Sequence, residues 1–468
     1  MNTAPLILWF RRDLRVTDLP MLTEALATGR PLLPVFILDP ETEAMGAAAL
    51  WRLGLGVESF DATLQALGSR LILRRGEALQ VLAQLIAETK AEGVFWSRCY
   101  DPATRPRDQA LKAALKARGL MAQSFPGFLL HEPWEVQTLQ GGYFKVYTPF
   151  WNSASKRPIP PSLPAPQTLP QPQAWPASDR LQDWDLGARM RRGAAVMRPH
   201  QRVGEAAALS RLAEFTDHRI GAYGEARDMM ALDGTSGLSE NLTYGEISPR
   251  MMWHAGFRAR EEGKPGAGQF LKEIVWREFA WALLHHTPHI AQTSWKPEWD
   301  DFPWGGESPK AEAWRRGMTG EPVIDAAMRQ LYVTGKMHNR ARMLVGSYLT
   351  KHLMTHWRVG MDWFADTLTD WDPAANAMGW QWVAGSGPDA APYFRVFNPA
   401  TQAEKFDPMQ AYRRRWLAEM SRDPLAHSYF DAVPKSWGLD PARPYPRPIV
   451  SLSAGREAAL AAYAQRKA

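Results

Sequence analysis

The sequence predicts an α/β domain with a doubly wound parallel sheet, then a long linker and an all-helical C-terminal domain. The first 126 residues alternate short β-rich runs with helical stretches, the order expected when helices connect parallel strands. Residues 158–176 hold many prolines and few charged residues, which is typical of an extended linker. From residue 202 the chain reads as helices nearly to its end. We therefore expect domains at 1–126 and 202–468, with an inter-domain linker at 127–201.

Strands and helices of the first domain follow from its apolar runs and the amphipathic stretches between them. The expected strands are 6–10, 32–38, 70–73, 94–97 and 121–125, and the expected helices are 47–67, 77–89 and 106–118. The turn after the first strand carries Arg11-Arg12-Asp13 in place of a Gly-x-Gly-x-x-Gly motif. A dehydrogenase-type dinucleotide fingerprint is therefore absent.

Helices of the second domain are separated by breaks rich in Gly, Pro and Ser. Examples are the ranges 206–219, 268–286, 322–334, 339–357 and 361–368. Two histidines in the fourth helix, His352 and His356, are four residues apart. They lack the adjacent glutamate of a zinc protease and an evident third ligand, so we expect them to pack or to face solvent, and no metal site is predicted.

Composition is that of an ordinary globular protein with two or three domains. The chain has 468 residues, of which 45% are hydrophobic and 22% are charged. No apolar run is long enough to span a bilayer, and the N-terminus does not read as a secretion signal. Cys99 is the single cysteine, which excludes an intrachain disulfide and a cysteine-ligated iron–sulfur cluster. A cytoplasmic location is expected.

Charge and aromatic content add two weaker indications. The net charge of +6 is compatible with a nucleic-acid partner, although many basic proteins bind no nucleic acid. The 21 tryptophans exceed what packing ordinarily needs, which favours stacking or electron transfer.

Residues 370–382 form the most informative segment. It contains two acids, one carboxamide and three tryptophans, and a helix opening near Pro373 would put Asp372 and Asn376 on one face, with Trp380 one turn further on. A polar site beside an indole suits a large, flat, redox-active ring. An ordinary capped, aromatic-rich core helix fits this segment equally well.

Two other segments carry chemistry-bearing side chains at helical spacing. Glu273, Trp276 and Arg277 project from one helix face among apolar neighbours, either as a satisfied internal ion pair or as a site. Asn339 and Arg342 likewise share a face, although a helix start with solvated arginines is the plainer interpretation. Residues 234–239 offer hydroxyl groups and glycines that could bind phosphates or simply cap a helix.

Together these segments resemble the DNA photolyase/cryptochrome family over nearly the whole chain, and most closely bacterial class III cyclobutane-pyrimidine-dimer photolyases. The resemblance is carried by Leu8-Trp9-Phe10-Arg11-Arg12-Asp13-Leu14-Arg15, Trp276-Arg277-Glu278-Phe279, Thr319-Gly320, Asp325-Ala326-Ala327-Met328-Arg329, Met337-His338-Asn339-Arg340 and the segment 370–382. It implies a Rossmann-like antenna domain and a helical domain that binds FAD. It also implies a deoxyribodipyrimidine photo-lyase, a carbon–carbon lyase that repairs DNA with blue light.

By position, the resemblance implies a set of cofactor-binding residues. They are Tyr223, Thr235, Ser236, Gly237, Leu238 and Ser239 on the diphosphate and ribityl side, Glu273, Arg277, Asn339, Arg342, Asp370 and Asp372 around the sugar and rings, and Asn376 facing the flavin N5. Arg342 and Asp370 would form a pair beside the flavin. Phe270 departs from the family, because many relatives have tryptophan there.

The substrate side follows from the same resemblance. A dimer flipped out of DNA would lie between Trp276 and Trp382, touch Met343, and meet the catalytic residues Glu273, Asn339 and Asn376. Glu273 could donate a hydrogen bond to a pyrimidine carbonyl if it holds a proton. The expected contacts to the DNA backbone are Arg227, Arg340 and Arg395.

Electron transfer and light harvesting complete the expectations. Trp380, Trp357 and Trp304 match the family's electron-hopping chain from the flavin to the surface. The expected second chromophore is 5,10-methenyltetrahydrofolate, although Ala103 and Thr104 replace the amide and carboxylate with which class I relatives hold folate. A deazaflavin or an empty antenna site is the alternative. The expected partner is DNA containing cyclobutane pyrimidine dimers, with no membrane, and the protein is expected to be a monomer.

Three rival functions fit parts of this pattern. A signalling cryptochrome is opposed by Asn376, where plant cryptochromes carry aspartate, and by Trp276 and Met343 on the substrate side. A 6-4 photolyase would carry a His-His pair where this chain has His338-Asn339. A non-specific nucleic-acid-binding module would explain the charge but not the flavin-type site.

Overall fold

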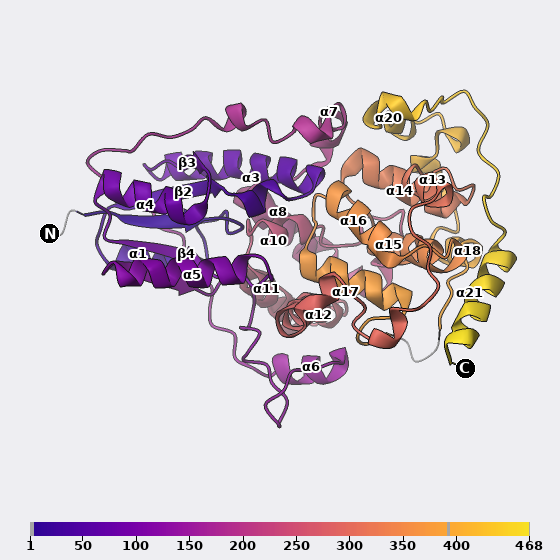
Figure 1. The fold of residues 1–468 in the computed structure, drawn as a ribbon, viewed down its shortest axis with the longest axis horizontal. Coiled ribbons are helices and arrows are strands. Elements are labelled where there is room, and N and C mark those ends of the chain that lie inside the picture. Colours follow the sequence, from indigo (N-terminus) through magenta and orange to yellow (C-terminus); the bar gives the residue numbers. More distant parts are fainter. Residues whose placement is uncertain (1–3, 391–393, 468) are drawn as a thin grey trace.

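The computed structural model describes residues 4–390 and 394–467, and it contains one parallel five-stranded sheet followed by a large helical region (Figure 1). The strand order is β3-β2-β1-β4-β5. Their bounds are β1 Leu6–Phe10, β2 Leu32–Leu38, β3 Ile72–Arg75, β4 Gly93–Ser97 and β5 Met121–Phe125. The direction in which the strands are added reverses between β1 and β4. In doubly wound sheets, ligands bind at this switch point, outside the carboxyl ends of the strands. The predicted fold class is confirmed.

Strand boundaries agree with the sequence prediction at β1, β2 and β5. Strand β3 begins two residues later than predicted, because Ile72 pairs with Val35 while the Leu71 amide donates to the Asp61 side chain at 2.7 Å. All residues of β1, β2 and β4 are buried, as expected of central parallel strands covered on both faces.

Helices cover both faces of the sheet (Figure 1). They are α1 Pro20–Ala27, α2 Pro40–Glu43, α3 Ala47–Ala66, α4 Ala78–Thr89 and α5 Thr104–Ala117. The three longest were predicted to within two residues at each end. The short helices α1 and α2 were not predicted, and both begin with proline at the first helical position.

The segment 127–201 is only partly an extended linker. It contains α6 Tyr147–Ala154 and α7 Gly193–Met197 in addition to short 3-10 turns. Residues 158–176 have no helix or strand, as the prolines predict, but they are pinned to the α/β domain. Leu32 N donates to Pro170 O at 2.8 Å, and Leu169 is buried in the core of the sheet.

In the helical region, the helices that carry the predicted site residues, α12, α15 and α17, lie side by side (Figure 1). Its helices are α8 Glu205–His218, α9 Tyr223–Ala226, α10 Ser239–Thr243, α11 Pro249–Glu261, α12 Ala267–His286, α13 Pro309–Arg315, α14 Pro322–Thr334, α15 Asn339–Ser347, α16 Trp357–Thr367, α17 Pro373–Ala384, α18 Pro399–Phe406, α19 Ala411–Trp416, α20 Pro424–Ala432 and α21 Leu452–Lys467. Helix α17 packs against α12, α15 and α16. Among the described residues, no helix is both long and apolar enough to cross a membrane.

The predicted single helix at 339–357 is wrong. Helix α15 ends at Ser347, a π-helical turn follows at Tyr348–His352, and α16 begins at Trp357. Met354 between them has a left-handed backbone with φ of 50°, and Thr355 pairs with Gly305 in an isolated bridge. A non-glycine residue in this conformation persists only where surrounding contacts hold it, so a long-range contact interrupts the helix.

Candidate functional site

Asp370 is the hub of the polar group predicted on the helical domain. The Arg342 guanidinium donates from Nη2 to both carboxylate oxygens, at 2.9 and 2.7 Å, and Ser239 Oγ donates to Oδ2 at 2.7 Å. Arg342 Nε also donates to Met337 O at 2.9 Å, which fixes the guanidinium from behind. The structure therefore contains the expected Arg342–Asp370 pair, and the exposed Ser239 joins it.

Asp372 lies two residues further on but is fully engaged with the protein. It caps α17 by accepting the Ala375 amide on Oδ1 at 2.8 Å, and its Oδ2 accepts Trp281 Nε1 at 2.9 Å. The sequence was compatible with either a cofactor site or a capped core helix, and the Asp372 side chain forms the helix cap. A direct cofactor contact from this carboxylate would have to share oxygens already in use.

Two predicted carboxamides, on α15 and α17, retain unused hydrogen-bonding capacity. Asn376 Nδ2 donates to Met361 O at 3.1 Å, and its Oδ1 has no partner among the described residues. Asn339 at the start of α15 is exposed, and its side chain makes no hydrogen bond within the described chain. Both are available to a ligand.

Helix α12 carries the predicted Glu273, Trp276 and Arg277, but the internal ion pair proposed for Glu273 and Arg277 is not formed. Glu273 instead pairs with Arg227 and accepts Gln269 Nε2 at 2.7 Å. Arg277 donates from Nη1 to Phe128 O at 2.9 Å and lies over the Phe128 ring. Its Nη2 is buried without a hydrogen-bond partner among the described residues, an unmet donor that a ligand could satisfy.

Residues 235–239 form a turn held from behind by a buried arginine. Arg211 donates to Ser236 O at 2.6 Å and to Thr235 O at 2.8 Å, while Gly237 takes the left-handed φ of 62° that favours glycine. Leu238 is buried beneath the turn. The Thr235 and Ser236 hydroxyls have no partner in the described chain, so this turn can offer donors to an anion.

Tyr223, the last of the predicted cofactor-binding residues, is held in place by aromatic packing. Tyr223 is buried, with its ring edge-on to Phe270 at 6.0 Å, and burial raises the pKa of its phenol above the ordinary value. Phe270 itself is buried against Gly256. The phenylalanine found where many relatives have tryptophan therefore packs in the core.

Three arginines surround His338. Burial, followed by the charges of Arg340, Arg342 and Arg227, lowers the pKa of His338 to about 4, and the nearby Asp228 opposes the shift. The ring is neutral at physiological pH and accepts the Arg340 amide on Nδ1 at 3.1 Å. The cationic side chains make this face attractive to an anion.

Arg340 and Arg395 differ in how freely they can reach DNA. Arg340 pairs with Asp228 at 2.8 Å and lies over the Phe406 ring. Arg395 is exposed, and its guanidinium lies over the Phe397 ring at 4.8 Å. Arg395 is therefore the more available of the two.

Trp276 and Trp382 are linked through a residue that the sequence did not single out. Tyr147 of α6 stacks on Trp276 with ring centres 3.7 Å apart and an interplanar angle of 6°. The backbone of Tyr147 donates to the Asp389 carboxylate, and Trp382 Nε1 donates to Asp389 O at 3.0 Å. The two indoles thus border one region, but one face of Trp276 is already covered.

The predicted electron-transfer tryptophans lie in one aromatic cluster. Trp357 and Trp380 are buried in it, and Trp304 packs against it half-buried. A Cβ on Gly360 of α16 would come within 2.0 Å of the Trp380 ring, so this glycine allows Trp380 to lie directly on the helix that Trp357 begins. The His356 ring lies 5.2 Å from Trp357 and 5.4 Å from Trp304.

The carboxyl edge of the sheet, where an antenna could bind, is occupied by charged side chains. Arg11 pairs with Asp108 at 2.6 Å, and Arg107 pairs with Asp108 at 2.8 Å and with Asp39. Thr104 donates from its hydroxyl to Asp101 at 2.7 Å. Ala103 and Thr104 therefore supply no free polar contact to a folate.

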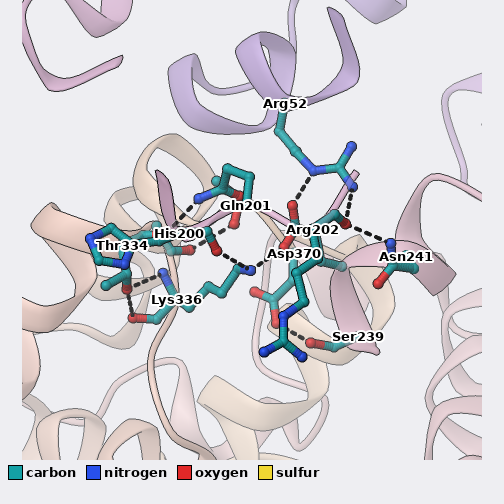
Figure 2. A network of polar contacts seen from close by, with 12 residues as sticks. Arg52, His200, Gln201, Arg202, Ser239, Asn241, Thr334, Lys336 and Asp370 are labelled. Atoms are coloured by element: carbon teal, nitrogen blue, oxygen red, sulfur yellow. Dashed lines mark hydrogen bonds and ion pairs between the residues drawn. The ribbon is translucent and has the colours of Figure 1, made fainter. Parts of the chain in front are cut away.

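Sequence reasoning missed the buried network that joins the two domains beside Asp370 (Figure 2). Arg52 on α3 pairs with Glu240 and Glu246, and Lys336 pairs with Glu240 at 2.5 Å. One signal was present, because Arg52 is the single charged residue in the apolar run 47–57. Tyr147 had no such signal, since it lies in the irregular stretch between the domains.

Comparisons with known proteins agree with the geometry. The family model described as DNA photolyase matches residues 6–171, and the one described as the FAD binding domain of DNA photolyase matches residues 270–465. The deoxyribodipyrimidine photo-lyase of Agrobacterium fabrum is 44% identical over 100% of this chain and 99% of its own.

Solved structures give the same result. The crystal structure of a bacterial class III photolyase from Agrobacterium tumefaciens superposes with a TM-score of 0.91 at 43% identity, covering 100% of this chain and 98% of that one. An archaeal photolyase from Sulfolobus tokodaii, solved with two FAD molecules that were taken to imply a novel light-harvesting cofactor, gives a TM-score of 0.82 at 28% identity, over 98% of this chain and 100% of that one.

Proposed function

The chain belongs to the DNA photolyase family, and from this premise we propose that it repairs cyclobutane pyrimidine dimers in DNA with blue light, as a deoxyribodipyrimidine photo-lyase that uses FAD. One observation carries the proposal most directly. The helical domain that holds the Arg342–Asp370–Ser239 group also carries side chains with unmet hydrogen-bonding capacity on α12, α15 and α17, and α17 packs against both α12 and α15. A molecule with both polar and flat aromatic parts would satisfy them.

The donor set fits FAD. The turn at 235–239 offers hydroxyl and backbone donors that a diphosphate could accept, and Tyr223 would line the same part of the cofactor. Arg277, with its unmet Nη2, and Glu273 would face the sugar and ring system together with Asn339. When bound and reduced, FAD supplies the light-excited electron that opens the dimer. The Arg342 guanidinium favours a negatively charged ring beside it, and Asn376 can meet N5 without adding charge.

Asp372 would contribute indirectly. Its carboxylate caps α17 and holds Trp281, so it orients the helix that carries Asn376. Its role in cofactor binding would therefore be to position other residues.

Glu273 is proposed to meet the pyrimidine carbonyl. In the protein alone it accepts hydrogen bonds from Arg227 and Gln269, so donation of a proton requires the Arg227 guanidinium to turn away. Phosphates of bound DNA offer Arg227 an alternative partner, which would release the carboxyl group. Full repair yield in Glu273→Ala would remove this role.

The dimer is proposed to lie between Trp276 and Trp382, with Met343 at its edge and Asn339 and Asn376 within reach. Tyr147 supports the covered face of Trp276, so the free face and edge remain for the base. A damaged, poorly stacked dinucleotide costs less to flip out of the duplex. Arg227, Arg340 and Arg395 would contact the backbone without reading sequence.

The tryptophans Trp380, Trp357 and Trp304 are proposed to pass electrons between the surface and the cofactor when it must be reduced. The indole N–H groups of Trp380 and Trp357 have no partner among the described residues. Trp380→Phe should slow photoreduction while repair by chemically reduced protein persists. Unchanged photoreduction would contradict the assignment.

Further proposals concern the antenna, the domain limits and the oligomeric state. A second chromophore, with methenyltetrahydrofolate the first candidate and a deazaflavin the alternative, would need contacts other than Ala103 and Thr104. The domain limits 1–126, 127–201 and 202–468 are retained as a working division. We also propose a cytoplasmic monomer, for which size-exclusion chromatography with light scattering would test the oligomeric state.

Blue-light repair of a thymine-dimer oligonucleotide under reducing conditions tests the proposal. Recovery of undamaged thymine in the light and not in the dark is expected, and it can be followed by absorbance or chromatography. Photoreduction of FAD without loss of the dimer would instead indicate a signalling cryptochrome or a different photoproduct.

A further inference from the structure

Helix α10 is a short connector with two working sides. Its five residues are too few for a stable isolated helix, so its position depends on side-chain contacts. Ser239 and Thr243, four residues apart on one side, both contact Asp370. Ser239 Oγ donates to the carboxylate at 2.7 Å, and Thr243 Oγ1 donates to the backbone carbonyl at 3.3 Å.

The other side of α10 faces the α/β domain. Glu240 accepts a hydrogen bond from Arg52 Nε of α3, and Tyr244, four residues after Glu240, lies under the same guanidinium at 4.9 Å. The Tyr244 hydroxyl lies 3.0 Å from Ala49 O on α3 and 2.7 Å from Thr369 O, immediately before Asp370. One ring therefore joins the two domains at the residue next to the hub.

The cations Arg52 and Lys336 offset the two carboxylates of this network, Glu240 and Glu246. Arg52 and Glu246 are both 0% exposed, and two parallel hydrogen bonds of 2.9 and 2.7 Å join them. Lys336 neutralises Glu240 from the side of α14. Loss of Arg52 alone would leave buried carboxylates without a counter-charge, so the network holds α10 in one position.

We propose that Arg52 is a positioning residue for the cofactor site, acting through α10 on the Arg342–Asp370 pair. The inference rests on the proposed placement of that pair beside FAD. Retention of the cofactor, which the helical domain binds, then depends on the docking of the α/β domain. A contact far in sequence, between residues 52 and 240, thus controls the geometry around Asp370.

Charge-balanced variants separate positioning from simple destabilisation. In Arg52→Met/Glu246→Gln, no buried charge is left unpaired, but the Arg52 contacts to α10 are gone. The matched control is Arg329→Met/Glu419→Gln, which removes a 2.7 Å pair between a fully buried arginine and a partly exposed glutamate within the helical domain. FAD release from each diluted holoprotein is followed in the dark by the fluorescence of free FAD, and the visible spectrum of bound flavin is recorded.

We expect FAD release about tenfold faster in the Arg52 double variant, the effect of losing roughly one charge-assisted hydrogen bond. The bound-flavin spectrum should change as well. The control should lose thermal stability without either change. A milder variant, Tyr244→Phe, removes only the shared hydroxyl and should accelerate release by a smaller factor in a fully folded protein.

The variant Asp370→Asn separates the role of Arg52 from the proposed placement of FAD beside Asp370. If Asp370→Asn accelerates FAD release but the Arg52 double variant and Tyr244→Phe do not, the role of Arg52 is overturned and the proposed site stands. If Asp370→Asn itself leaves release unchanged, the placement of the site fails first. Equal acceleration in the Arg52 variant and the control would show a general stability effect and would also overturn the role.

Discussion

The carboxyl edge of the sheet and the centre of the helical domain both hold buried aspartates paired with arginines. At the sheet edge, Arg11 and Arg107 bind Asp108 and Asp39, and both guanidinium groups lie over the Trp9 ring. These charged groups are paired with one another. General rules for doubly wound sheets would have placed a ligand at this edge.

The helical centre differs in the kind of side chain that is left without a hydrogen-bond partner. Asp370 has its partners, but Asn339, the Asn376 carbonyl and Arg277 Nη2 have hydrogen-bonding capacity that no described residue uses. Of these groups, Arg277 Nη2 is the buried donor, and leaving it unmet costs free energy that a bound ligand would restore. Buried polar atoms without a partner also occur at the sheet edge, on Trp9, Asp13 and Ser97, so the two regions differ in which side chains are left unpartnered and not in whether any are.

The largest expected difference between the two regions is in FAD affinity, when one aspartate in each is replaced by asparagine. Asp370→Asn removes the charge that balances Arg342, and FAD affinity should fall about 100-fold, since loss of one partner of a buried pair costs roughly 3 kcal/mol or more. Asp39→Asn makes the same change beside Arg107 and should leave FAD affinity unaltered. Titration of each apoprotein with FAD measures both constants, and equal losses would erase the distinction between the regions.

Replacement of one tryptophan in each domain compares their contributions to binding of damaged DNA. Trp276→Ala should weaken binding of a dimer-containing oligonucleotide by about 1–3 kcal/mol, the range measured for base–aromatic stacking. Trp175→Ala, which removes an indole packed against the sheet domain, is the control and should bind normally. Fluorescence anisotropy with damaged and undamaged strands checks the result, and a loss that is equal for both strands would argue against a dimer contact.

Acid should destabilise the helical region more than the sheet. Burial lowers the pKa of His338 and His352 to about 4, whereas residues 1–126 contain no histidine. Between pH 6.5 and 4 the unfolded chain binds protons that the folded chain does not, so these groups remove stability as the pH falls through that window. Buried Glu278 and Glu321, with pKa values raised to about 7, act in the opposite direction, so a variant is needed to isolate the histidines.

His352→Gln should therefore flatten the acid loss by up to about 1 kcal/mol per pH unit. Urea unfolding between pH 7 and 4.5 measures the slope, and His254→Gln on the partly exposed face of α11 is the control. Hydrogen exchange at pH 5 should show the helical region opening before the sheet. An unchanged slope in His352→Gln would contradict the buried, neutral state of this ring.

The smallest effect concerns the DNA backbone. Arg395→Gln should reduce the slope of log affinity against log salt by about one unit and weaken binding about fivefold near physiological salt. Arg340→Gln should do less, since Arg340 already pairs with Asp228. Arg75→Gln on the sheet domain, whose partner is Glu43, should change neither quantity.

Much of the fold could be predicted because its signals are local. Alternation of apolar strands and amphipathic stretches predicted the parallel sheet, and an aspartate before proline predicted that α17 begins at Pro373. The helix at 339–357 was wrong because its interruption has a distant cause. Thr355 pairs with Gly305, and no periodicity within the segment reports that contact.

The same division holds for the site. The sequence by itself, through family motifs, predicted a set of cofactor-binding residues, and it named Arg342 and Asp370 as a pair, which the structure contains. Only the tertiary structure decided that Glu273 pairs with Arg227 instead of Arg277, that Tyr147 covers one face of Trp276, and that Arg52 reaches α10. Spacing along a helix restricts which side chains share a face, but the partner of a charge or ring is chosen by whichever element packs against that face.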